Sequence, residues 1–180
     1  MPRRSAGIVL HRRGEDGETE VLLVHPGGPF WAKKDAGAWS IPKGEHGDDE
    51  EPLAAALREF AEELGVAPPD DSEPQPLGEV RQKGGKVVAA WALAGDLDPE
   101  AIVSNTFELE WPPRSGRRQA FPEVDRAGWF GAAAAREKLL PAQLPLLDRL
   151  DELLASRAPR PPHAPAPTHA SARANGSPAR

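Results

Sequence analysis

The feature that most constrains the fold is the stretch Gly44–Val66, GEHGDDEEPLAAALREFAEELGV. Its apolar residues recur at intervals of three and four, which predicts an amphipathic helix with one apolar face. These positions are Leu53, Leu57, Phe60 and Leu64. Pro52 suits the first turn of a helix, and Gly65 suits the position just after the last turn. We therefore expect a helix over Pro52–Leu64 that packs through this face against the core of a domain.

The remaining surface of this helix is strongly acidic. The stretch Gly44–Val66 holds eight carboxylates and one strong base, Arg58. Glu59, Glu62 and Glu63 are spaced i, i+3 and i+4, so they share one region of the helix surface and repel one another. A solvated acidic surface is one interpretation. The other is a divalent cation, because carboxylate oxygens are hard ligands that suit Mg²⁺ or Mn²⁺.

The spacing of the whole stretch decides between these interpretations. An EF-hand loop is excluded, because counting from Asp48 places Leu53 at the sixth position, where Gly is required. The stretch resembles instead the Nudix box, G-x5-E-x7-R-E-U-x-E-E-x-G-U, in which U is a bulky aliphatic residue. All seven fixed positions match, and Phe60 is the one departure, at a position that is usually aliphatic. The segments WSIPKGE and PEVDRAGWF, which start at Trp39 and Pro122, also resemble Nudix domains.

The resemblance implies a fold and an activity. The implied fold is an α/β/α sandwich with a mixed β-sheet over residues 3–154, in which a loop–helix–loop carries the metal ions. The implied activity is hydrolysis of a nucleoside diphosphate linked to another group. The implied cofactor is Mg²⁺ or Mn²⁺, and the implied partner is a small-molecule nucleotide substrate.

The resemblance also implies roles for individual residues of the box. The metal ligands are Gly44, through its backbone carbonyl, and Glu59, Glu62 and Glu63. Glu59 is in addition a candidate for acting on the attacking water. Arg58 and Glu50 form a brace that orients the glutamates. This division suits phosphoryl transfer, which needs neutralised phosphate oxygens and a water placed in line.

Further candidates lie outside the box, and each has a simpler interpretation as solvated surface. Glu123 resembles an additional catalytic acid of some family members. Lys43, just before the box, is placed to contact a phosphate. The loop residues Trp31, Lys33 and Lys34 suit stacking on a base and binding a distal phosphate. A cluster of arginines in PPRSGRRQ suits a polyphosphate clamp: Arg114, Arg117 and Arg118.

The remaining elements follow from apolar periodicity. Strands are predicted over residues 5–10, 20–25, 39–42, 77–81, 86–93, 106–111 and 127–130, and further helices over residues 132–139 and 142–154. The first two strands form a hairpin, and the long loop Pro26–Ala38 is a candidate functional loop. The Pro- and Ala-rich residues 155–180 are predicted to form a disordered tail.

Composition and charge exclude several classes of protein. The net charge of −6 argues against a general nucleic-acid binder, which presents a basic face. The absence of cysteine excludes disulfides, zinc–thiolate sites and a cysteine nucleophile. The apolar runs are too short for a signal peptide or a membrane span, so we expect a cytoplasmic protein with no membrane partner. His11, His25 and His46 lack metal-binding spacing and are interpreted as structural or solvated.

The substrate is the least constrained prediction. Dinucleoside polyphosphate hydrolases of the family often carry Tyr seventeen residues past the box, where this chain has Lys83. ADP-ribose hydrolases carry Pro about fifteen residues past it, where this chain has Arg81. The segment WSIPKGE is nevertheless similar to diadenosine tetraphosphate hydrolases, and the lysine-bearing loops favour a long, highly charged substrate. We therefore expect a dinucleoside polyphosphate hydrolase. The alternatives are a pyrophosphatase for oxidised or surplus nucleoside triphosphates, and a nucleotide-binding sensor without activity.

Overall fold

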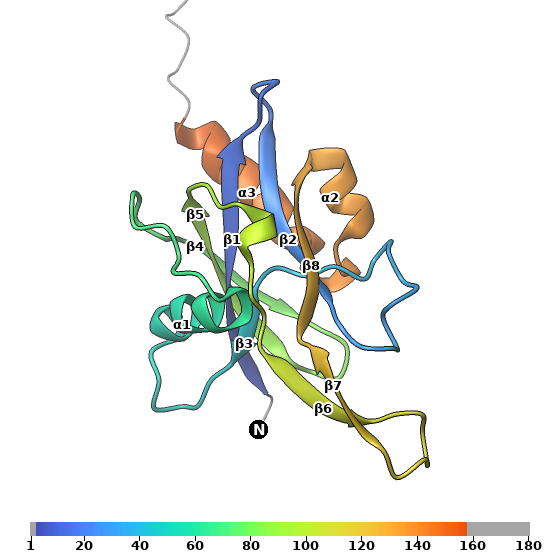
Figure 1. The fold of residues 1–180 in the computed structure, drawn as a ribbon. Helices are drawn as coiled ribbons and strands as arrows, with labels where there is room; N and C mark the ends of the chain where they lie inside the picture. The colour runs from blue at the N-terminus through green and yellow to red at the C-terminus, as the bar shows by residue number, and fades with distance from the viewer. Residues whose placement is uncertain (1–2, 158–180) are drawn as a thin grey trace, which may run out of the picture.

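The structure of the chain is a computed structural model that describes residues 3–157 (Figure 1). Its elements, in chain order, are β1 (Arg4–Arg13), β2 (Thr19–Pro26), β3 (Lys43–Glu45), α1 (Pro52–Leu64), β4 (Gln75–Arg81), β5 (Val87–Ala94), the 3-10 helix η1 (Pro99–Ala101), β6 (Thr106–Glu110), β7 (Arg118–Pro122), β8 (Val124–Gly131), α2 (Ala132–Lys138), the 3-10 helix η2 (Pro141–Gln143) and α3 (Leu144–Arg157).

Six of the strands form one mixed sheet. Its order is β4-β5-β1-β2-β8, and β3 pairs with β1 outside this path. Strand β1 is parallel to β5 from Arg4 to His11 and antiparallel to both β2 and β3. Strand β3 pairs with the N-terminal half of β1, at Ser5–Gly7, whereas the paired residues of β2 meet its C-terminal end, at His11–Arg13. Strand β1 therefore organises the sheet.

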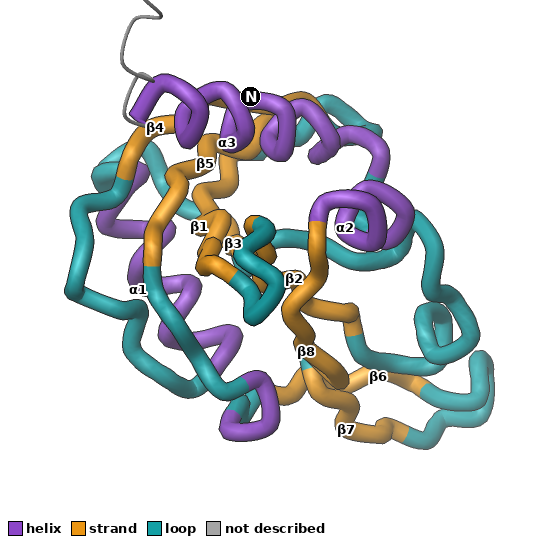
Figure 2. The backbone as a smooth tube through the Cα atoms, turned by 90° about the horizontal axis from the view of Figure 1, so that it is seen from above, coloured by secondary structure: helices purple, strands orange, loops and turns teal. Residues whose placement is uncertain are grey.

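The sheet separates two apolar cores, which gives the domain three layers. Alternate residues of β1 serve opposite faces, as the pleat requires. Ile8 and Leu10 pack in the core that contains Phe60 of α1, and Val9 packs in the core that contains Leu146 of α3. Figure 2 shows α1 on one side of the sheet, with α2 and α3 on the other. The predicted α/β/α sandwich with a mixed sheet is confirmed.

Helix α1 begins and ends at the predicted residues. Glu51 caps its N-terminus, where the Glu51 carboxylate accepts a hydrogen bond from the Ala54 N–H at 2.9 Å. Gly65 ends the helix in the left-handed region, with φ of 67°. The fully buried side chains are Ala55, Ala56, Phe60 and Leu64. Leu53 and Leu57 are only half-buried, so two small alanines take the central positions of the inner face and let the helix approach the sheet closely.

Two predictions about strands are wrong. The predicted strand at residues 39–42 is replaced by isolated bridges, from Trp39 to Leu139 and from Ser40 to Val24, and the strand itself lies further along, in β3. The sequence does not predict β7, because its two polar residues are followed by three apolar ones and show no alternation, and four of the five residues are exposed. Strand β7 pairs with β6 in a separate two-stranded hairpin, which extends away from the body of the domain (Figure 1).

The last helix is longer than predicted. Helix α3 continues to Arg157, so residues 155–157 are helical rather than disordered. The rest of the predicted tail, residues 158–180, lies outside the described residues. Between residues 3 and 157, no helix is both long enough and apolar enough to cross a membrane.

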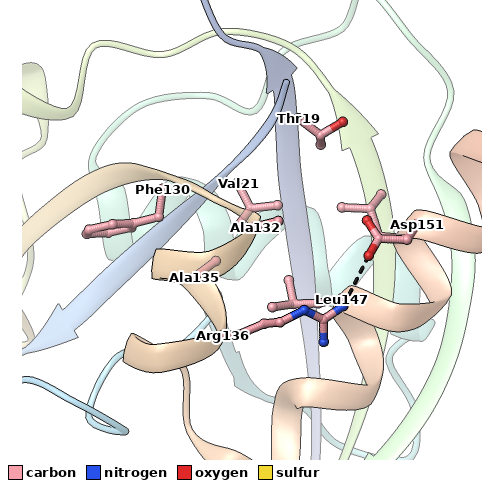
Figure 3. A pocket seen from close by; sticks show the side chains of 9 residues that line it. Thr19, Val21, Phe130, Ala132, Ala135, Arg136, Leu147 and Asp151 are labelled. Carbon is pink, nitrogen blue, oxygen red and sulfur yellow. Dashed lines mark hydrogen bonds and ion pairs between the residues drawn. The ribbon is translucent and has the colours of Figure 1, made fainter. Parts of the chain in front are cut away.

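The packing of α2 and α3 on the sheet leaves a small cavity of about 20 Å³. Figure 3 shows Thr19 and Val21 on one side of it and the ion pair between Arg136 and Asp151 on the other. The Arg136 Nη2 and Asp151 Oδ2 atoms are 3.1 Å apart. A space of this size holds about one water molecule. It is therefore a packing feature of the α2–α3 layer and not a candidate substrate site.

Candidate active site

Arg58 is the centre of the acidic cluster. Its Nε and Nη2 atoms donate to the two carboxylate oxygens of Glu50, at 2.8 and 2.9 Å. Its Nη1 atom donates to Glu59 Oε1 at 2.7 Å and to Glu62 Oε2 at 3.0 Å. These bonds raise the pKa of Arg58 above its ordinary value, and the bond to Glu50 makes the largest contribution. Arg58 in turn lowers the pKa of Glu50. The pair predicted as a brace is thus in contact, and it reaches two of the three glutamates.

Gly44 lies directly against the Glu59 carboxylate. The pairing of Gly44 with Ala6 fixes β3 beside β1, and α1 packs across both strands. A Cβ atom on Gly44 would overlap the carboxylate group of Glu59. The Glu59 side chain is 15% exposed, so it has little freedom to move aside. The missing side chain at position 44 therefore creates the cradle in which the Glu59 oxygens lie next to backbone.

Glu63 and Lys43 lie side by side, and burial disfavours the charged form of both side chains. The Glu63 Oε2 atom accepts a hydrogen bond from the Lys43 backbone N–H at 2.9 Å. Burial raises the pKa of Glu63 to about 7, against the opposing effect of the Lys43 charge. Burial also lowers the pKa of Lys43, with Glu63 acting in the opposite direction. A ligand that brings a cation to Glu63 or an anion to Lys43 would favour the charged form of each.

A cavity of about 220 Å³ opens beside these two residues. Its lining residues are Val24, Pro26, Trp31, Ala38, Ser40, Ile41, Lys43, Glu63, Glu123, Val124 and Leu140. The fold thus gathers four predicted residues from distant segments: Trp31, Lys43, Glu63 and Glu123. The cavity combines two acids and a cation with apolar walls, which suits a ligand that has both charged groups and an aromatic ring.

The other predicted residues lie elsewhere. Lys33 and Lys34 are exposed and do not line this cavity, and the Lys34 Nζ atom lies 4.7 Å from the ring centre of Trp31. The arginine cluster belongs to the β6–β7 hairpin. Arg114 lies in its turn with φ of 65°, and Arg118 pairs with Glu108 at 3.3 Å. None of these arginines lines the cavity, so the structure does not bring the cluster to the box.

The oxygen atoms of the box suit a hard divalent cation. The three glutamates of α1 supply carboxylates, and Glu59 is cradled against the Gly44 backbone. Across residues 3–157, no three acidic or histidine side chains are gathered closely enough to enclose an ion. Each glutamate instead accepts a hydrogen bond, from Arg58 or from the Lys43 N–H. Metal binding would exchange some of these hydrogen bonds for metal–oxygen bonds.

Two buried polar residues support the cavity and have no signal in the sequence. Gln143 is fully buried, accepts from the Ile41 N–H at 3.0 Å and donates to Ser40 Oγ at 3.0 Å. His25 is also fully buried, and both of its ring nitrogens have partners. Periodicity does not identify a single polar residue that turns inward, so only the fold reveals these supports. The structure agrees with the interpretation of His25 as structural, while His46 is half-buried.

Comparison with known proteins decides the family. The family model described as NUDIX domain matches residues 1–150. This chain belongs to the Nudix family. The family consists of hydrolases of phosphoanhydride bonds that typically use a divalent metal. The predicted family and fold class are therefore confirmed, and the predicted enzyme class is that of the family.

The Nudix domain has similar relatives among characterised and solved proteins. It is 32% identical over 116 residues to the nucleoside triphosphate pyrophosphatase/Nudix hydrolase fusion protein of Bifidobacterium longum, a match that spans 61% of this chain and 23% of that protein. The NUDIX domain of Shewanella oneidensis NrtR, solved with ADP ribose, has a TM-score of 0.57 at 20% identity, covering 86% of this chain and 89% of that one. A C. elegans Ap4A hydrolase binary complex has a TM-score of 0.55 at 20% identity, covering 86% and 98%. The two structures share the fold of this chain.

Proposed function

We propose that this Nudix domain is a pyrophosphohydrolase, dependent on Mg²⁺ or Mn²⁺, that cleaves a phosphoanhydride bond in a nucleoside diphosphate linked to another group. The substrate class that we favour is a dinucleoside polyphosphate such as diadenosine tetraphosphate. One observation carries the proposal. Glu63 belongs to the acidic cluster of the box and also lines the cavity, where Lys43 and Trp31 face the same space.

The box supplies the metal side of the site. Gly44 and the glutamates of α1, Glu59, Glu62 and Glu63, would hold the divalent cation. When bound, this cation neutralises phosphate oxygens and lowers the pKa of a water molecule. Arg58, itself held by the two hydrogen bonds that it donates to Glu50, would keep Glu59 and Glu62 oriented.

The cavity supplies the substrate side. Lys43 offers an ammonium group to a phosphate oxygen, and Trp31 offers a ring face for a base. Lys33 and Lys34 lie on the same loop as Trp31 and are candidates for a distal phosphate. Glu123 lines the cavity beside Glu63, so it is a candidate, together with Glu59, for accepting a proton from the attacking water.

A second hollow favours a substrate with two ends. Leu140 lines the cavity beside Glu63 and also a larger hollow of about 540 Å³. The other lining residues of this hollow are Gln82, Lys83, Pro141 and Ala142. Gln82 has a buried Nε2 atom without a partner within residues 3–157, so this donor is available to a ligand. A dinucleoside polyphosphate would place one nucleoside in each hollow, with the polyphosphate across Leu140.

The test is turnover of diadenosine tetraphosphate and dGTP, side by side with Mg²⁺, followed by chromatography of the products. We expect the dinucleotide to give a nucleoside triphosphate and a monophosphate. Glu63→Gln should abolish turnover, whereas Glu152→Gln, an exposed glutamate on α3, should not. Activity in Glu63→Gln equal to that of the wild type would overturn the role given to the box.

A nucleoside triphosphate pyrophosphatase is the second candidate. It is favoured by the relative in B. longum, whose name combines a nucleoside triphosphate pyrophosphatase with a Nudix hydrolase. The products separate the two candidates, because this activity converts dGTP to a monophosphate and pyrophosphate. If neither substrate is turned over while both bind in the presence of Mg²⁺, the domain is a nucleotide sensor and the hydrolase proposal is wrong.

A further inference from the structure

A fully buried histidine joins the loop of the cavity to the sheet. His25 lies in β2 and is 0% exposed. Its Nδ1 atom lies 2.7 Å from Asp125 Oδ1, and its Nε2 atom lies 2.7 Å from the carbonyl oxygen of Lys34. Lys34 belongs to the loop at residues 27–38, which also carries Trp31 of the cavity wall. His25 therefore ties this loop to β8, where Asp125 lies.

Both partners of His25 present hydrogen-bond acceptors. A backbone carbonyl cannot donate, and an ionised carboxylate cannot donate either. A neutral imidazole has one N–H and can make only one of the two bonds. The Asp125 carboxylate also accepts from Arg126 Nε at 3.4 Å, so it is the acceptor in both of its contacts. The two short contacts therefore require a proton on each ring nitrogen of His25.

We propose that His25 is a positioning residue for the substrate cavity. As an imidazolium it donates to both Asp125 and the Lys34 carbonyl, and so holds the loop at residues 27–38 in the shape that places Trp31 in the cavity wall. The ion pair with Asp125 offsets the cost of burying the charge. The role of this loop in nucleotide binding rests on the proposed function, whereas the two hydrogen bonds of the His25 ring do not depend on it.

The surroundings of His25 define which part of the loop it controls. The charged groups around it are Asp125 and Arg126 on β8, Lys34 and Asp35 in the loop, and Lys138 on α2. Trp39 packs edge-on against His25, with ring centres 5.2 Å apart. Asp35 accepts hydrogen bonds from Trp39 Nε1 at 2.8 Å and from Lys138 Nζ at 2.7 Å. These bonds hold the end of the loop independently of His25, so His25 controls the earlier part, around Trp31 and Lys34.

Loss of one proton from His25 breaks one of its two bonds. The remaining N–H stays with the negative Asp125, and the Nε2 lone pair then faces the Lys34 carbonyl oxygen. This contact is repulsive, so the loop moves away. Raising the pH should therefore loosen the loop around Trp31 and Lys34, while the sheet stays intact.

Asp125→Asn is the decisive variant. An asparagine at this position donates from its amide to Nδ1, while Nε2–H keeps the bond to Lys34, so a neutral ring satisfies both contacts. Glutamine in place of His25 has a single amide group at its end and is expected to keep one contact. The two variants thus separate the need for a histidine from the need for an extra proton.

The experiment measures hydrogen-exchange protection of the Trp31 and Lys34 amides between about pH 6 and about pH 9, where histidine titrates. These amides donate to the carbonyls of Gly28 and Trp31, at 3.3 and 2.8 Å. Nitrogen-15 spectra of the histidine rings report the protons on His25, with the half-buried His46 as the internal reference. The whole chain is used without metal or substrate, so the outcome is independent of the hydrolase proposal.

In the wild type we expect two ring N–H groups on His25 wherever loop protection is high, and a fall in loop protection of about tenfold or more at high pH, the scale of one charge-assisted hydrogen bond. Asp125→Asn should show one ring N–H and constant protection, and His25→Gln should show low protection throughout. Amides of the β1–β5 pair confirm that each variant is folded. A single ring N–H in the wild type with full protection, or an Asp125→Asn variant that follows the pH course of the wild type, would overturn the proposal.

Discussion

The Glu59 carboxylate occupies the space that a side chain on Gly44 would need. Gly44→Ala must therefore displace Glu59 from the β3 backbone. We expect turnover to fall about 100-fold or more, because a shift of about 1 Å in a catalytic group has effects of this size. The measurement is kcat with the preferred substrate. Gly131→Ala is the matched control, since a Cβ at that position meets no atom within 4 Å, and equal losses in both variants would contradict the prediction.

Arg58→Lys keeps the positive charge but loses the paired bonds to Glu50 and the shared contact to Glu59 and Glu62. We expect kcat to fall about 10- to 100-fold, the usual cost of removing a group that orients metal ligands. The kcat of Glu50→Gln should fall by a similar factor. Because the two residues act as one brace, the double variant should be little worse than either single variant, and multiplied losses would show that they act separately.

Metal binding should stabilise the domain through the glutamates of α1. At a Mg²⁺ or Mn²⁺ concentration about 100 times the Kd, the expected stabilisation is about 2.7 kcal/mol, or about 5–10 °C in Tm. A chelator should reverse this shift. Glu59→Gln and Glu63→Gln should reduce it, whereas Glu152→Gln should keep it. Differential scanning measurements check this, and identical shifts in all three variants would place the metal elsewhere.

Lys83→Ala tests the hollow next to the cavity. Lys83 lines this hollow but not the cavity that contains Glu63. We expect KM for diadenosine tetraphosphate to rise about tenfold, since one ion pair or hydrogen bond to a charged group contributes about this much. The KM for dGTP should stay unchanged, because one nucleotide fills only the cavity beside Glu63. An equal rise for both substrates would mean that the hollow has no separate role.

Gln143→Leu should destabilise the domain. It removes the partner of the Ile41 N–H and leaves this group buried without a hydrogen bond, whereas Ser40 Oγ keeps its bond to the Ile41 carbonyl at 2.8 Å. The expected loss is about 1–3 kcal/mol in the free energy of unfolding, measured by urea denaturation. Gln119→Leu on the exposed strand β7 is the control and should stay within about 0.5 kcal/mol of the wild type.

The sequence predicts the fold class and the residues of the box because both leave a local signal. The helix Pro52–Leu64 is readable from its caps and its apolar spacing, and the box residues stand at fixed intervals around it. Contacts between distant segments leave no such signal. The bridge from Trp39 to Leu139 and the gathering of Trp31 with Glu123 depend on how the sheet is assembled.

Exposure is the second reason for error. Strand β7 is mostly exposed, so no apolar alternation marks it, and the sequence does not predict this strand. The prediction that Lys33 and Lys34 bind a distal phosphate stays a prediction, because both side chains are exposed and lie outside the cavity. Buried polar residues are the third source of missed features. Gln143 and His25 are fully buried, and only the structure shows which groups they bond to.

The pairing of β3 with β1 makes the first strand a tether for the site. Strand β3 carries Lys43 and Gly44, and within the described residues its one strand partner is β1. The first link of this pairing region is the hydrogen bond from the His46 N–H to the Arg4 carbonyl, at 3.2 Å. Gly44 itself pairs with Ala6, one step further along the same strand. The position of Gly44 against Glu59 therefore depends on a strand that carries none of the candidate metal or substrate residues.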